Sequence, residues 1–147
     1  LHDALVELTG TLAGLTFALQ NTRVVGLAGF ITGIAASLSM AASEYLSQKS
    51  EEGKNPLKSA FYTGVAYILT VVVLVLPYFI FRSYYLALGV TISAVFFVVL
   101  FFTFFVSVVK DQPFRGLFLE MISISIGVAV ISFIIGLATR KILGIEV

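Results

Sequence analysis

The stretch "VVGLAGFITGIAASLSMAAS" (Val24–Ser43) runs without a single charged side chain. A helix needs about 20 predominantly apolar residues to cross the hydrocarbon core of a bilayer, because it rises only about 1.5 Å per residue. The stretch has that length, and the first charge after it is Glu44. It therefore predicts a transmembrane helix, which we place at residues 24–45.

The composition of the whole chain agrees with a membrane protein. Its 147 residues are 59% hydrophobic and 12% charged, whereas about 25% charged residues is usual for a soluble domain. The net charge of +1 argues against nucleic acid as a partner. The lack of cysteine excludes disulfides and thiol catalysis. Because the sequence also shows no nucleophile–base set and no phosphate loop, we expect neither an enzyme nor a resident cofactor.

Four further segments resemble the first in their apolar character. Runs such as "ILTVVVLVL" (Ile68–Leu76) would also suit buried strands, but open strands cannot satisfy their backbone groups in lipid. We therefore predict an all-α polytopic membrane protein, a single domain over residues 1–147. The five predicted transmembrane helices lie at about 3–20, 24–45, 59–81, 83–109 and 116–139.

Basic residues in the connecting segments predict the orientation in the membrane. The side that holds the N-terminus has Lys49, Lys54, Lys58, Lys110 and Arg115. The opposite side has Arg23, Arg82, Arg140 and Lys141. The small excess predicts a cytoplasmic N-terminus, with the chain in the cell (inner) membrane if it is prokaryotic.

Small residues predict where the helices pack closely. Gly10 and Gly14 form a GxxxG motif, which lets two helix backbones approach each other. We expect the first two helices at the centre and the phenylalanine-rich fourth helix facing lipid. We also predict a homodimer, although the same motif packs helices within one chain.

Three acids and a methionine fall near one end of the first helical hairpin. Asp3 and Glu7 share a face of the first helix, and Met40 and Glu44 share a face of the second, because residues four apart are neighbours on a helix. The short turn between the helices should bring Asp3 level with Glu44 and Glu7 level with Met40. Carboxylates bind hard divalent cations, and a thioether adds a preference for softer transition metals. These four residues are the predicted metal site.

Acids inside a membrane are costly, and this makes them functional candidates. Neighbouring carboxylates repel one another unless a proton or a metal ion neutralises them. Metal ions and protons would then compete for one site, as in an antiporter. The alternatives are structural: Asp3 as a helix N-cap, Glu44 as a membrane-interface residue and Met40 as filler of the core.

Other polar residues are weaker candidates. Thr32, Ser37 and Glu120 form a possible secondary path, although the two hydroxyls also fit local hydrogen bonds within a helix and Glu120 also fits the membrane interface. Glu51 and Glu52 lie in the longest polar connection. They are candidates for feeding metal to the path, or simply residues of a solvated loop.

Two stretches resemble the vacuolar iron transporter family. They are "HDALVELTGTLAGLTFALQNT" (His2–Thr22) and "AGFITGIAASLSMAASEYLSQKSE" (Ala28–Glu51). The resemblance implies a dimeric five-helix transporter that moves Fe²⁺, and often Mn²⁺, out of the cytosol in exchange for protons. It also implies that Asp3 and Met40 line the path, with Glu44 in the same motif.

The sequence departs from the family pattern in two ways. The loop Ser47–Lys58 is too short for the Glu-rich metal-binding insertion of plant and fungal-type members. Thr32 stands where some members carry a carboxylate, and Glu7 stands where a small or hydroxyl residue is common. Glu7 is therefore a candidate replacement for the missing ligand.

The short loop and "HDALVELTG" (His2–Gly10) are closest to the branch that fuses a ferritin-like domain upstream. Because the chain starts with Leu rather than Met, we expect it to continue upstream. The alternative function is a non-transporting membrane anchor and dimerisation module for such a domain. A metal-gated channel is a third hypothesis.

Overall fold

The computed structural model of the protein describes residues 2–51 and 55–144. Their five helices are α1 (His2–Leu19), α2 (Thr22–Lys49), α3 (Pro56–Ile80), α4 (Tyr84–Lys110) and α5 (Phe114–Leu143). No strand occurs in these two ranges. The all-helical prediction is therefore confirmed, because the long β-branched runs fold as helices that satisfy their own backbone hydrogen bonds.

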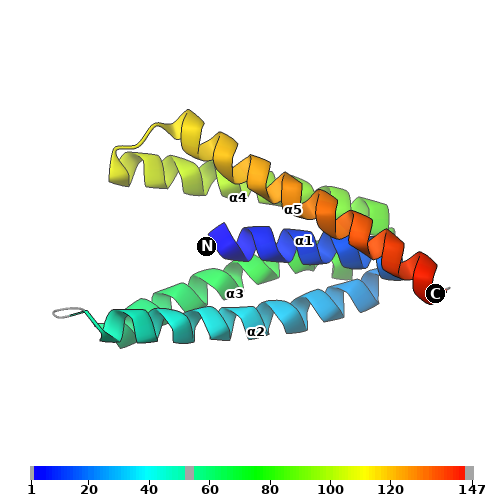
Figure 1. Ribbon diagram of the computed structural model, residues 1–147, viewed down its shortest axis with the longest axis horizontal. Coiled ribbons are helices and arrows are strands. Elements are labelled where there is room, and N and C mark those ends of the chain that lie inside the picture. The colour runs from blue at the N-terminus through cyan, green and yellow to red at the C-terminus, as the bar shows by residue number, and fades with distance from the viewer. Residues whose placement is uncertain (1, 52–54, 145–147) are drawn as a thin grey trace.

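Successive helices run in opposite directions, and α1 lies between the α2–α3 pair and the α4–α5 pair (Figure 1). The N-terminus and the α2–α3 and α4–α5 connections lie at one end, and the other two connections lie at the opposite end. The prediction that both first helices are central is thus half right. Helix α1 is central, whereas α2 lies on the outside against α3.

Four helices, α2 to α5, are long and apolar enough to cross a membrane. Helix α1 is not among them, so five spanning helices are not confirmed. Asp3 and Glu7 lower the hydropathy of its first two turns. The fourth helix was predicted to face lipid. The exposure of its phenylalanines agrees with this, and Phe101 is 72% exposed. Four long apolar helices whose apolar faces are exposed indicate an integral membrane protein.

Local sequence explains where α2 and α3 begin. The Asn21 side chain accepts hydrogen bonds from the first amides of α2, and the Asn55 side chain accepts one from Lys58 at the start of α3. Pro77 does not end α3, which continues to Ile80. The Thr91 hydroxyl of α4 donates to the Leu74 carbonyl at 3.0 Å, in the turn before this proline.

The GxxxG motif of α1 packs against α5 within the chain. A Cβ on Gly14 would lie 2.9 Å from the Ser132 carbonyl oxygen, and one on Gly136 would overlap the Gly14 carbonyl. A Cβ on Gly10 would meet the side chains of Val128 and Ser132. The two helices run in the same direction (Figure 1), and their backbones touch because small residues face each other. The motif therefore fixes the position of α1 in the bundle.

Candidate functional site

The packing of α1 on α2 decides which predicted site residues meet. Leu12 of α1 touches Gly29 of α2, and Leu8 and Gly33 line one pocket. Asp3 is therefore not level with Glu44, nor Glu7 with Met40. Met40 lies six residues beyond the level of Glu7, which is about 9 Å along the helix. The expected register is wrong because a side-chain contact, and not the length of the turn, sets how two helices pack.

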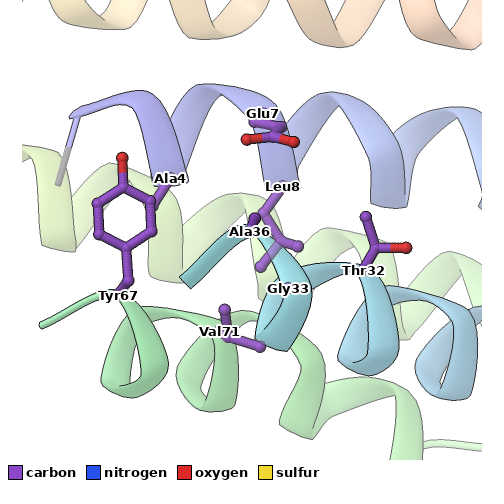
Figure 2. Close-up of a pocket in the computed structure, with 8 residues that line it drawn as sticks. All are labelled: Ala4, Glu7, Leu8, Thr32, Gly33, Ala36, Tyr67 and Val71. Carbon is purple, nitrogen blue, oxygen red and sulfur yellow. The ribbon is translucent and has the colours of Figure 1, made fainter. Parts of the chain in front are cut away.

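A pocket between α1, α2 and α3 contains Glu7 and Thr32 (Figure 2). It is completed by Ala4, Leu8, Gly33, Ala36, Tyr67 and Val71. Its volume of about 10 Å³ is close to the space that one water molecule needs. Glu7 and Thr32 are exposed at its rim, whereas Tyr67 is 3% exposed. The sequence suggested that Glu7 replaces a carboxylate that some family members carry at the position of Thr32. The structure places these two residues in one pocket.

Tyr67 is a site residue that sequence reasoning missed. Its ring rises from α3 and its hydroxyl points toward the first turn of α1 (Figure 2). There the phenol lies within electrostatic range of the carboxylates of Asp3 and Glu7. A lone tyrosine in an apolar helix gives no sequence signal of its partner, because the register of α3 against α1 is a tertiary property.

Met40 and Glu44 lie nearer the end of the bundle. Both are half-buried, and Glu44 accepts a hydrogen bond of 2.6 Å from the Ser59 hydroxyl of α3. Ser59 also lines an open pocket of about 280 Å³ with Gln48, Asn55, Lys58 and Tyr62. Glu44 therefore joins α2 to α3 near the end of the bundle, ten residues beyond the level of Glu7, which is about 15 Å along the helix.

The secondary candidates are spread over the molecule. The Ser37 hydroxyl is buried and donates to the Gly33 carbonyl at 2.7 Å, which is a local bond within α2. Glu120 is exposed on α5, and Glu51 is exposed just after α2. Glu52 lies outside the described residues. The structure thus brings Thr32 to the pocket and leaves the other three described candidates elsewhere.

The oxygen atoms around the pocket are hard ligands. Glu7 supplies a carboxylate and Thr32 and Tyr67 supply hydroxyls. The carboxylate of Asp3 lies within electrostatic range of Tyr67, and such oxygen donors fit a divalent cation. Within residues 2–51 and 55–144, however, no three histidine, cysteine or acidic side chains lie close enough together to hold a metal ion.

The charged residues divide between the two ends of the bundle. We call the end with the N-terminus the acidic end, because every acid among the described residues lies there. These acids are Asp3, Glu7, Glu44, Glu51, Asp111 and Glu120. The opposite end, the basic end, carries Arg23, Arg82, Arg140 and Lys141. The acidic end also carries Lys49, Lys58, Lys110 and Arg115, so acids outnumber basic residues there by six to four among the described residues.

Residues 1–55 match the sequence profile described as the VIT family. The matched segment covers α1 and α2, which carry Glu7, Thr32 and the other predicted ligands of the hairpin. No curated protein matches the chain. Together with four apolar helices, the match supports a membrane transporter, and it supports the vacuolar iron transporter family for the hairpin that holds the candidate site.

Proposed function

We propose that this protein carries Fe²⁺ or Mn²⁺ out of the cytosol in exchange for protons. The observation that carries the proposal is the pocket of Glu7 and Thr32, which lies in the segment that matches the VIT family. Two exposed acids on the central helix of an apolar bundle are costly unless they bind an ion. Their position at the acidic end fits uptake of a cation from that side.

Proton coupling follows from the chemistry of the ligands. A carboxylate holds either a proton or a metal ion, so metal binding releases protons and protonation releases metal. Asp3 and Glu7 are the groups that exchange one for the other. The Met40 thioether lies about 9 Å further along α2, so it would form a second binding position on the path, where a softer ligand favours transition metals over Ca²⁺ and Mg²⁺.

A second copy of the chain would complete the site. The exposed face of α2 beside the pocket presents a row of small residues, Thr32, Ala35, Ser39 and Ala42. Such a face suits close packing of two helices in a membrane. A two-fold axis at this face would double the carboxylates and thioethers around one path. It would also remove Asp3 and Glu7 from contact with lipid.

Transport assays in proteoliposomes test the proposal. The purified protein is reconstituted with a metal-sensitive and a pH-sensitive dye, and a metal gradient is applied at equal pH. We expect metal movement with protons moving in the opposite direction, and a loss of both in Asp3→Asn, Glu7→Gln and Met40→Leu. The matched control is Asp111→Asn, an exposed acid at the same end in a left-handed conformation that asparagine tolerates.

The outcomes separate the three hypotheses. Equal transport by the wild type and all three variants would refute the assigned site. Metal movement without protons would indicate the metal-gated channel. Reconstituted protein that moves no metal would favour the membrane anchor, including one that serves an upstream ferritin-like domain. Protease added to one side of the membrane tests the orientation, because it cuts the α2–α3 loop only if the loop is on that side. A cytoplasmic N-terminus predicts cleavage from the cytoplasmic face.

A further inference from the structure

A large apolar groove lies between α1, α4 and α5, on the other side of α1 from the pocket of Glu7. Its volume is about 520 Å³. Its walls include Ala13 and Phe17 of α1, Leu88 of α4, and Ile122 and Phe133 of α5. Nearly all of the lining is apolar, so water is a poor occupant and a hydrocarbon is a good one.

The length of the groove matches one leaflet of a bilayer. Ile122 and Phe133, its outermost lining residues on α5, are eleven residues apart, which is about 16 Å along a helix. The hydrocarbon core of a membrane is about 30 Å thick, so one leaflet is about 15 Å. The groove therefore accommodates a single acyl chain from its carbonyl end to its terminal methyl group.

Aromatic and basic side chains stand at the end of the groove marked by Phe133. The ring of Phe17 meets Phe133 at 4.4 Å and Tyr85 at 6.2 Å between centroids. Tyr84 lies against Tyr85 at 4.2 Å and interacts electrostatically with Arg140. Arg140 follows Phe133 by two helical turns and so shares its face of α5. Tyrosine and arginine are residues that sit at the level of lipid headgroups.

This mouth opens at the basic end of the bundle. The four basic residues there face no acid among the residues that the structure describes. An anionic headgroup at the mouth would therefore be attracted by these basic residues. A second copy packed over the same groove through a two-fold axis would instead bring like charges together, and this disfavours protein as the occupant.

We propose that the groove binds one acyl chain of an anionic phospholipid, whose phosphate group is held by Arg140 and Tyr84. The site is independent of the proposed transport function, because it lies on the opposite face of α1 and at the opposite end of the bundle. Each arginine near an anionic headgroup contributes about fivefold in binding. The protein should therefore select anionic over zwitterionic lipid at this position.

Fluorescence quenching by brominated lipids tests the proposal. The chain contains no tryptophan, so Phe133→Trp gives a single reporter at the mouth of the groove. The full chain is reconstituted in phosphatidylcholine vesicles that contain a low fraction of brominated phosphatidylglycerol or of brominated phosphatidylcholine. Phe101→Trp on α4, where the native side chain is 72% exposed, is the matched control for ordinary lipid contact.

We expect the brominated anionic lipid to associate with Phe133→Trp about fivefold more strongly than the zwitterionic lipid, and with Phe101→Trp no more strongly. Adding Arg140→Gln should abolish the preference. Equal quenching of Phe133→Trp by the two lipids overturns the proposal, as does a preference that survives Arg140→Gln. Absence of quenching by either lipid also overturns it, because protein then covers the groove. Phe17→Trp repeats the measurement from α1 if Phe133→Trp does not fold.

Discussion

Replacing Gly136 by alanine tests how α1 is held in the bundle. The added Cβ would lie 3.0 Å from the Gly14 carbonyl carbon and would overlap its oxygen. Backbone atoms cannot rotate away as a side chain can, so α1 and α5 must separate. Separation removes the close contact along the crossing of Gly10 and Gly14 with Ser132 and Gly136. Overpacking of this kind costs about 3 kcal/mol.

The helix propensity of alanine offsets part of this cost. Alanine is about 1 kcal/mol better than glycine in a helix interior, so the net loss in the free energy of unfolding is about 2 kcal/mol. Gly127→Ala in the same helix is the matched control, because a Cβ at that position meets nothing within 4 Å. It should leave the stability unchanged or raise it by up to about 1 kcal/mol.

The measurement is unfolding of the purified protein in mixed micelles with increasing denaturing detergent, followed by circular dichroism. The two alanine variants should differ by about 2–3 kcal/mol. If Gly136→Ala unfolds at the same detergent fraction as Gly127→Ala, the α1–α5 crossing does not hold α1, and the reasoning is refuted. Transport by Gly136→Ala should also fall, because α1 carries Asp3 and Glu7.

Two further predictions concern pairs of polar side chains, Glu7 with Thr32 and Tyr78 with Thr16. Glu7→Thr should lower metal transport at least about tenfold, the equivalent of about 1.4 kcal/mol of binding. Adding Thr32→Glu should restore most of the transport, since both residues line one pocket. A double variant as inactive as Glu7→Thr would contradict the shared site. Tyr78→Phe removes the buried 2.6 Å hydrogen bond to Thr16 and should lower the stability by about 0.6–1 kcal/mol in the same unfolding assay. The exposed Tyr62→Phe is its control, and an equal effect of the two would show that the buried bond contributes nothing.

The helices themselves were predictable because their signal is local. A bilayer-length apolar run such as 24–43 has one stable fold in lipid, and the asparagines before α2 and α3 cap the helices that follow them. The acids of α1 were visible for the same reason, since a charge in an apolar sequence stands out. By contrast, the first helix is not among the candidate membrane spans, because its own acids reduce its apolar character.

The sequence by itself determined that this chain is a bundle of apolar helices with acids at one end of the first hairpin. Only the tertiary structure decided which side chains meet. It placed Glu7 beside Thr32 and Tyr67 instead of Met40, and it directed the GxxxG face of α1 toward α5. The physical reason is that helix register depends on how side chains from distant segments interlock. A shift of one turn changes every partner while leaving the hydrophobic pattern of each helix unchanged.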